Sequence, residues 1–304
     1  MMGGALVLAI GAIFLSYCLM LKTCAVKHAP AINENEKVAL LKEAQTHASQ
    51  GDDDKAIRDY RVIIAKYPDS AEAESTLYAL ASLYEKRKDY LKAKELYKSV
   101  IAKFPSASAI PALQESLDNV NIKILFSDIL TPDSFIYEVQ KGDTLAKLAK
   151  KFGTTMELIS TANGLKGDMI RIGQKIKITK ARFSIVVDKS QNILTLKSDE
   201  TMVKTYRVST GKGYSTPAGK FTITNKIVEP TWYTTGAVIS PGSPDNILGS
   251  RWMGISKPGY GIHGTTEPQS IGKQVTAGCI RMLNPDIIEL YTILPEGTEV
   301  VIVD

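Results

Sequence analysis

The order of apolar and polar residues divides the chain into four stretches. Residues 3–21 form an uninterrupted apolar run, and residues 36–126 have the spacing of amphipathic helices. Residues 135–179 combine two short strand patterns with two helix patterns, whereas residues 182–304 mostly alternate as strands do. The pattern predicts a multidomain α+β chain, and a length of 304 residues suits about two or more domains.

The N-terminal run is long enough to cross a membrane. Its nineteen uncharged residues, Gly3–Leu21, would reach about 28 Å as a helix, close to the thickness of the hydrocarbon core. We interpret residues 1–24 as a membrane anchor or an export signal. Lys22 and Lys27 follow the run, against the usual charge bias, and Lys22 also weakens a lipoprotein signal at Cys24. A buried helix is the remaining alternative.

Residues 34–127 contain an internal repeat. The segments DKAIRDYRVIIAKYPDSA and LKAKELYKSVIAKFPSAS align at an offset of 37 residues. The aligned pairs are Ala56 with Ala93, Tyr60 with Tyr97, and Pro68 with Pro105. Such a period predicts stacked helical hairpins and resembles the tetratricopeptide repeat. The repeats could bind envelope proteins, mediate oligomerisation, or act as a rigid spacer.

Residues 134–180 predict a small strand-helix-helix-strand unit. FIYEV is a strand pattern, and an apolar helix face follows it, made by Leu145, Leu148, Ala149 and Phe152. Gly153 can end that helix in a left-handed conformation. A second helix precedes Asn163-Gly164, and KIKI is a closing strand.

This unit resembles the LysM module over its whole length, through YEVQKGDTL, ANGL and IGQKIKI. The resemblance implies binding to N-acetylglucosamine polymers such as peptidoglycan. The groove would lie between the loop of Gly142, Asp143 and Thr144 and the loop that carries Met169 and Ile170. Nine basic and four acidic residues suit an anionic cell wall.

The last stretch, residues 182–303, predicts a mainly-β domain. FSIVVDK and NILTLKS form a hairpin pattern, and TYRVSTG, GKFTITNKI and TEVVIV add further strands. PDIIELYTIL is the best helix candidate. Glycine and proline are dense between positions 211 and 272, which predicts long loops.

Cysteine and histidine are scarce, and this scarcity narrows the candidate chemistry. The chain has three of each, but beyond position 50 only Cys279 and His263 remain, in the stretch GIHGTTEPQSIGKQVTAGCIRM. A structural zinc site usually needs four such ligands and a catalytic one three, so we expect no metal site.

A thiol nucleophile needs a base, because a free cysteine with a pKa near 8.5 is mostly protonated at neutral pH. His263 could accept that proton, and the Gly264 carbonyl could orient the ring. Gly278 would let backbone amides approach an oxyanion. A free cysteine is also among the most buried residue types, so the pair alone leaves two ordinary buried residues open.

Three motifs in this order resemble the L,D-transpeptidase catalytic domain of YkuD type: STPAGKF, YGIHGT and TAGCIRM. The resemblance implies a β-sandwich with a capping loop, peptidoglycan stem peptides as substrates and no cofactor. It implies Cys279 as nucleophile and His263 as base. It also implies that the Gly264 carbonyl orients the ring and that amides around Gly278 and Cys279 form the oxyanion hole. Arg281 would brace the loop or hold a substrate carboxylate.

The same resemblance suggests substrate contacts near the thiol. Tyr260, Thr265, Thr276 and Ala277 flank the two catalytic candidates, and Ala277 stands where many family members carry histidine. The segment that resembles the capping loop contains Trp232, Tyr233, Asn246 and Trp252. Simple loop packing is an equal explanation for those four residues.

The predicted function is therefore cross-linking of peptidoglycan stem peptides outside the cytoplasm. Water as acceptor would make the enzyme a carboxypeptidase, and a protein lysine would make it a lipoprotein-anchoring enzyme. A non-catalytic wall-binding scaffold is a further alternative. The net charge of +5 is too mild to indicate nucleic acid as a partner.

Overall fold

The computed structural model describes residues 34–106 and 108–304. Cys18, Cys24 and the apolar run that we interpret as an anchor or signal lie outside the described residues. Within the described part, no helix is both long and apolar enough to span a bilayer. The chain divides into two compact units, one ending at Leu83 and the other running over Tyr84–Asp304.

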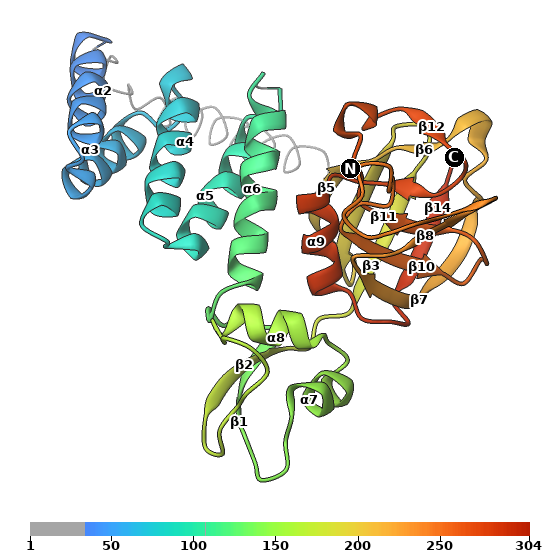
Figure 1. Ribbon diagram of the computed structural model, residues 1–304. Helices are drawn as coiled ribbons and strands as arrows, with labels where there is room; N and C mark the ends of the chain where they lie inside the picture. Colours follow the sequence, from blue (N-terminus) through green and yellow to red (C-terminus); the bar gives the residue numbers. More distant parts are fainter. Residues whose placement is uncertain (1–33, 107) are drawn as a thin grey trace, which may run out of the picture. The chain divides into compact units, whose positions relative to one another are not determined.

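The first unit is helical (Figure 1). It contains α2 (Glu34–Ser49), α3 (Asp53–Lys66) and most of α4 (Ala71–Lys86). Ala44, Ala56 and Ala73 are fully buried, since small side chains let helices pack closely. The buried ammonium of Lys37 pairs with Glu34 and Glu72, each at 2.8 Å, which ties α2 to α4.

The second unit opens with α5 (Tyr90–Lys103) and α6 (Ile110–Leu125). The predicted repeat is visible in the helix ends. α3 and α5 begin 37 residues apart, and their C-caps, Tyr67 and Phe104, have similar backbone angles. The matching Ala56 and Ala93 are both fully buried.

The predicted strand-helix-helix-strand unit is also present. Its elements are β1 (Ser134–Glu138), α7 (Leu145–Phe152), α8 (Met156–Ala162) and β2 (Lys175–Thr179). Thr144 caps α7 by accepting a hydrogen bond from Lys147 N at 3.2 Å, and Gly153 ends this helix with φ +66°. β1 and β2 pair antiparallel over a core that includes Leu145 and Leu148.

The remaining residues form the predicted mainly-β domain around an eight-stranded sheet (Figure 1). The strand order is β13-β11-β10-β7-β14-β3-β4-β5. The ten-residue strand β7 joins the two halves, because its first part pairs with β14 and its second part with β10. The strands are β3 (Phe183–Asp188), β4 (Ile193–Ser198), β5 (Thr201–Arg207), β7 (Gly219–Val228), β10 (Arg251–Ile255), β11 (Gly261–His263), β13 (Ile280–Arg281) and β14 (Glu299–Val303).

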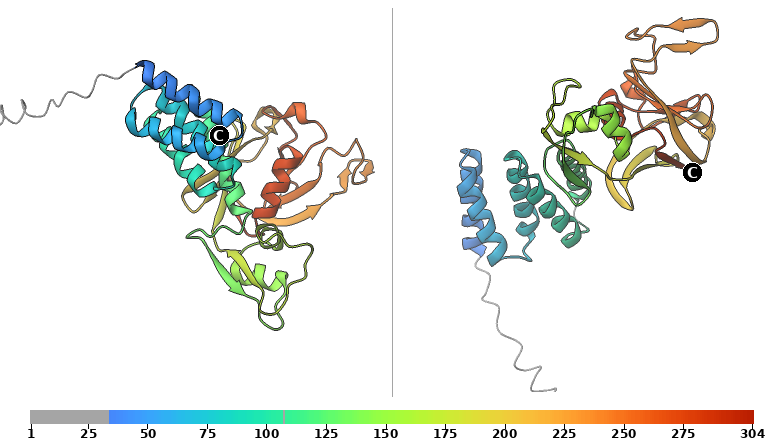
Figure 2. Two further views of the ribbon diagram at one scale, coloured as in Figure 1. Left: turned by 90° about the vertical axis from the view of Figure 1, so that its left-hand side faces the viewer. Right: turned by 90° about the horizontal axis from the view of Figure 1, so that it is seen from below.

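Smaller elements complete this domain. The helix α9 (Asn284–Ile293) contributes Ile287, Leu290 and Ile293 to the core. Two pairs of short strands lie outside the main sheet, and the β8–β9 hairpin projects from the rest of the domain (Figure 2). These strands are β6 (Thr210–Gly211), β12 (Gln274–Thr276), β8 (Trp232–Thr234) and β9 (Ala237–Ile239).

Helix α6 packs on the edge of the eight-stranded sheet. Asp118 accepts a hydrogen bond from Thr205 N at 2.9 Å, and Asn121 Nδ2 donates to Val203 O, also at 2.9 Å. Ile122 belongs to the core of the mainly-β domain. A helix of the repeat region therefore covers the outer edge of β5.

Candidate active site

β11 and β13 pair in parallel, so His263 lies beside Arg281, and Cys279 immediately precedes the paired segment. Ile262 lies opposite Ile280, and His263 lies opposite Arg281. Side chains alternate along a strand and paired residues share a face, so His263 and Arg281 point to the same side of the sheet. The opposite face carries the fully buried Ile262, Ile280 and Met282, which anchor both strands in the core.

The imidazole of His263 is held from two sides. Its Nδ1 lies 2.7 Å from the Gly264 carbonyl, which only accepts, so Nδ1 carries the proton. The indole of Trp252 stacks on the ring, with centroids 5.9 Å apart and planes 18° apart. Burial lowers the pKa of His263 to about 4, so the ring is neutral at physiological pH.

Asn284 fixes the backbone around Gly264. Its Oδ1 accepts from Ser250 N at 3.1 Å and Thr265 N at 3.0 Å, and its Nδ2 donates to Thr265 O. A Cβ at position 264 would lie 2.1 Å from Asn284 Oδ1, so only glycine fits there. Asn284 was not predicted from the sequence, where it looks like an ordinary helix-start residue.

Cys279 is partly exposed at the end of the loop before β13. Its Sγ donates to Gly259 O at 3.7 Å. Among the described residues, no hydrogen bond joins Sγ to the His263 ring. Burial raises the pKa of the thiol, while hydrogen bonding to the Gly261 backbone and the charge of Arg281 oppose this shift.

Two threonines hold the loop that leads to Cys279. Thr276 Oγ1 donates to Cys279 O at 2.6 Å and accepts from Gly278 N at 3.2 Å. Thr216 Oγ1 donates to Gly278 O at 2.8 Å. Gly278 has φ +139°, and a Cβ there would lie 2.6 Å from the Tyr260 ring. Thr216 belongs to the STPAGKF motif, but the sequence alone indicated no role for this residue.

The guanidinium of Arg281 is almost fully buried and braces a neighbouring loop. Its Nη1 donates to Glu267 Oε2 at 2.6 Å and to Ser270 Oγ at 2.9 Å. Its backbone exchanges two hydrogen bonds with Ser209. These bonds agree with the bracing alternative, and contact with a substrate carboxylate stays a prediction.

The segment thought to resemble a capping loop is only partly a loop. Trp232 and Tyr233 lie in β8 of the projecting hairpin, and Tyr233 is 75% exposed. Asn246 is buried and donates to Pro230 O at 2.8 Å, which closes the base of the segment. Trp252 lies beyond the hairpin in β10 of the main sheet, where its indole stacks on His263, and its contact with substrate stays a prediction.

The remaining substrate candidates surround the thiol loop. Tyr260 packs against the domain core and Gly278, whereas Thr265 is buried beside Asn284. Ala277 is exposed next to Cys279. The Tyr260 ring therefore packs against the loop that leads to Cys279, and Ala277 is part of that loop.

In the small βααβ unit, the two candidate glycan loops flank one backbone pairing. Val139 N donates to Gln174 O, and Gly173 N donates to Val139 O. The Asp143 carboxylate accepts from Tyr137 and from Gln140 N, so it shapes its own loop. Gly142 has φ +89°, Ile170 packs partly on the core, and Met169 is 87% exposed.

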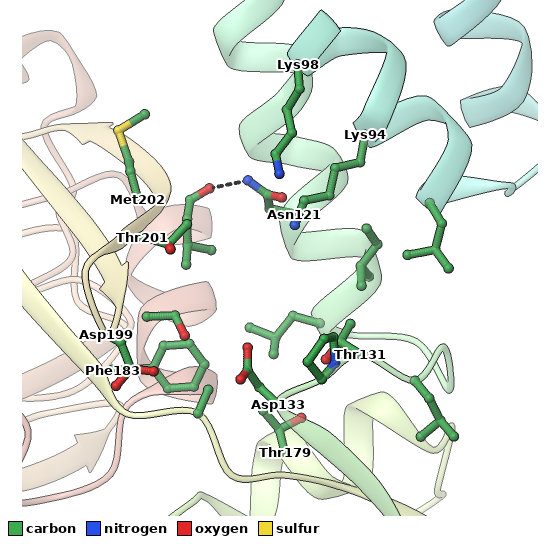
Figure 3. A pocket seen from close by; sticks show the side chains of 18 of the residues that line it. Lys94, Lys98, Asn121, Thr131, Asp133, Thr179, Phe183, Asp199, Thr201 and Met202 are labelled. Carbon is green, nitrogen blue, oxygen red and sulfur yellow. Dashed lines mark hydrogen bonds between the residues drawn. The ribbon is translucent and has the colours of Figure 1, made fainter.

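A cavity of about 610 Å³ lies within the unit Tyr84–Asp304. Its walls come from α5, α6, the segment before β1 and the turn between β4 and β5, and Lys94, Asn121 and Asp133 contribute polar groups (Figure 3). Neither Cys279 nor His263 lines it.

Across the described ranges, no group of His, Cys, Asp and Glu side chains is arranged to hold a metal ion.

Comparison with known families agrees with this architecture. Residues 182–302 match the L,D-transpeptidase catalytic domain, YkuD, and residues 137–179 match the LysM domain. Residues 38–70 and 75–107 each match a tetratricopeptide repeat. The three resemblances inferred from the sequence, and the α+β fold class, are therefore confirmed.

Two relatives each match about half of the chain or somewhat less. The putative L,D-transpeptidase YkuD of Bacillus licheniformis is 40% identical over 173 residues, which are 54% of this chain and 96% of that protein. The putative L,D-transpeptidase YqjB of Bacillus subtilis is 42% identical, over 40% of this chain and 70% of that protein. These matches define an enzyme of the L,D-transpeptidase class. The chain belongs to the YkuD family of these enzymes and carries a LysM peptidoglycan-binding module.

Part of the chain is also similar to solved structures. The L,D-transpeptidase from Mycobacterium smegmatis is 18% identical with a TM-score of 0.36, over 44% of this chain and 65% of that chain. The catalytic domain from the E. faecium L,D-transpeptidase is 26% identical with a TM-score of 0.34, over 40% of this chain and 98% of that chain.

Proposed function

We propose that the protein cross-links peptidoglycan stem peptides through a thioester on Cys279, with His263 as the base. One observation carries the proposal. The partly exposed thiol of Cys279 immediately precedes β13, and β13 pairs in parallel with β11, which ends at the buried, neutral and oriented imidazole of His263. A neutral imidazole with Nδ1 protonated leaves Nε2 free to accept a proton.

The ionisation states suggest how the first acyl transfer proceeds. The thiol is mostly protonated, because burial raises its pKa. As Sγ attacks the carbonyl carbon of the third stem residue, its proton passes to His263 Nε2 and the carbonyl electron pair moves to oxygen. Collapse of this intermediate expels the terminal D-alanine, whose nitrogen takes the proton from the imidazolium.

The second acyl transfer resolves the thioester. An amine on another stem peptide loses a proton to His263, attacks the thioester carbonyl and releases the thiol. The product is a cross-link between two third residues. Water in place of the amine would give a carboxypeptidase, and a protein lysine would give a lipoprotein anchor, through the same acyl-enzyme.

The other regions support a cell-wall location for this chemistry. Residues 134–180 would hold the enzyme on glycan strands outside the cytoplasm. Residues 34–127 would act as a spacer or as a site for envelope proteins, and residues 1–24 as an anchor or signal. The LysM match and the basic charge of residues 134–180 support the wall-binding part.

The deciding experiment is incubation of the purified protein with disaccharide tetrapeptides, followed by mass spectrometry. We expect a thioester adduct on the Cys279 peptide and a cross-linked dimer that lacks one D-alanine. A trimmed tripeptide without dimer would favour the carboxypeptidase. If neither the adduct nor any product appears, the scaffold alternative replaces the enzyme.

A further inference from the structure

A single buried hydroxyl group links the STPAGKF motif to the loop that carries the thiol. Thr216 is 1% exposed. Its Oγ1 accepts from Gly211 N at 2.7 Å and donates to Gly278 O at 2.8 Å, across 62 residues of sequence. Because a backbone N–H can only donate, the hydroxyl proton is free to point to the Gly278 carbonyl.

The fit around this hydroxyl is close. A Cβ at position 211 would lie 2.2 Å from Ser215 Oγ and 2.6 Å from Thr216 N. Glycine at this position therefore allows the backbone to approach Thr216. This close packing holds the Thr216 hydroxyl on the buried side of the loop that leads to Cys279.

Two neighbouring backbone groups of the loop are also occupied, whereas the Cys279 N–H is not. Thr276 Oγ1 accepts from Gly278 N and donates to Cys279 O. Within residues 34–106 and 108–304, the Cys279 N–H has no hydrogen-bond partner. It is the amide donor nearest to the sulfur along the chain, and it belongs to the same peptide group as the Gly278 carbonyl.

From this arrangement we infer that Thr216 is a positioning residue that aims the Cys279 N–H at the substrate oxyanion. The inference rests on the proposed acyl transfer. A trans peptide is planar, so its C=O and N–H point in opposite directions. A hydrogen bond that holds the Gly278 carbonyl toward Thr216 therefore turns the Cys279 N–H toward the open side of the loop.

The same arrangement refines the expected oxyanion hole. The family resemblance implied amides around Gly278 and Cys279, and of these the Gly278 N–H is bonded to Thr276. The Cys279 N–H would then receive the negative charge that forms when Sγ attacks the carbonyl carbon. Removing an oxyanion donor lowers rates by about 100- to 1,000-fold in well-studied enzymes, and we expect about 10- to 100-fold for a residue that only orients the donor.

The test uses two reactions of the same thiol in the full-length protein. Acylation by the carbapenem imipenem or by a disaccharide tetrapeptide forms an oxyanion, whereas alkylation by iodoacetamide displaces iodide and forms none. Thr216→Val replaces the hydroxyl with a methyl of similar size. We expect acylation, and kcat for cross-linking, to fall about 10- to 100-fold, with KM and the alkylation rate close to the parent values.

Three further variants separate orientation from general stability. Thr216→Ser keeps the hydroxyl and should acylate within about threefold of the parent. Thr216→Ala should repeat the selective loss even if the valine variant fails to fold. Thr298→Val removes another buried threonine hydroxyl, which donates to Pro295 O at 2.6 Å, and should leave both reactions unchanged.

The outcomes distinguish this inference from the proposed function. Normal acylation of both Thr216→Val and Thr216→Ala overturns the inference and leaves the proposed function intact. A parallel fall in acylation and alkylation also overturns it, because the hydroxyl would then support the thiol or the fold in general. A parent protein that is alkylated but never acylated overturns the proposed function together with the inference.

Discussion

At the scale of single residues, burial sets the ionisation of the two candidate catalytic side chains. Burial lowers the pKa of His263 to about 4 and raises the pKa of Cys279. Both shifts oppose a resting thiolate–imidazolium pair, because burial penalises the charged forms. The base is therefore available over the whole physiological range, while the thiolate forms only as the reaction proceeds.

This ionisation state predicts how labelling of the thiol depends on pH. We expect iodoacetamide to modify the Cys279 peptide faster with each unit of pH from 6 to 9, since only the thiolate reacts. The curve of the folded protein should lie at higher pH than that of the urea-unfolded protein, because folding raises the pKa. Mass spectrometry of that peptide gives both curves. A plateau of fast labelling below pH 7 would contradict the prediction.

Removal of either catalytic candidate should stop the chemistry but not the folding. Cys279→Ser substitutes a far weaker nucleophile, and we expect thioester formation and cross-linking to fall by about 1,000-fold or more. His263→Ala should lose a similar amount, and the double variant little more, since members of one catalytic unit are not additive. Unchanged far-UV circular dichroism and wall binding provide the control. Cross-linking by Cys279→Ser at the parent rate would reject the nucleophile assignment.

At the scale of secondary structure elements, α6 protects the free edge of β5. The edge strand of a sheet presents unpaired N–H and C=O groups that can template aggregation. Asp118 and Asn121, on adjacent turns of α6, bond the Thr205 N–H and the Val203 carbonyl. The helix therefore satisfies two groups that a ninth strand would otherwise pair.

Loss of one of these bonds should destabilise the mainly-β domain. Asp118→Ala removes the partner of the half-buried Thr205 N–H, and we expect a loss of about 1–3 kcal/mol in the free energy of unfolding. Both tryptophans lie in this domain, so urea unfolding followed by their fluorescence reports on it. Glu115→Ala removes an exposed carboxylate from the same helix and should have no effect. Equal midpoints for the two variants would show that the edge contact does not stabilise the domain.

The elements differ in how far the sequence could predict them. Helix and strand patterns of five or more residues were sufficient for the helical repeats, the βααβ unit and most long strands. The strands β6 and β13 have two residues each, too few for a pattern, and form only because distant segments pair.

Cys279 and His263 were identifiable because cysteine and histidine are scarce. Thr216 and Asn284 are common residue types, and their interactions depend on backbone groups that only the fold brings near.

At the scale of the whole molecule, the proposed function gives the LysM module and the catalytic domain different parts of one polymer. Glycan strands are insoluble and abundant, so binding to them would raise the local concentration of stem peptides around Cys279. Met169 and Ile172 are 87% and 71% exposed on the loop that we assign to glycan binding. Exposed apolar side chains of this kind are suited to the apolar faces of sugar rings.

A negative charge on this loop should weaken binding to the wall without changing the turnover of soluble substrates. Met169→Glu removes an apolar contact and adds a negative charge to a basic module facing an anionic wall. We expect about a tenfold loss of co-sedimentation with isolated peptidoglycan, and a matching loss of cross-linking on intact wall. Turnover of soluble disaccharide tetrapeptides should be unchanged, because they reach the thiol without the module.

Val62→Glu places the same charge on an exposed apolar position of α3 and serves as the control. If Met169→Glu cross-links intact wall as fast as Val62→Glu, the loop does not tether the enzyme. If it also loses turnover of soluble peptides, the substitution acts on the catalytic domain rather than on wall binding.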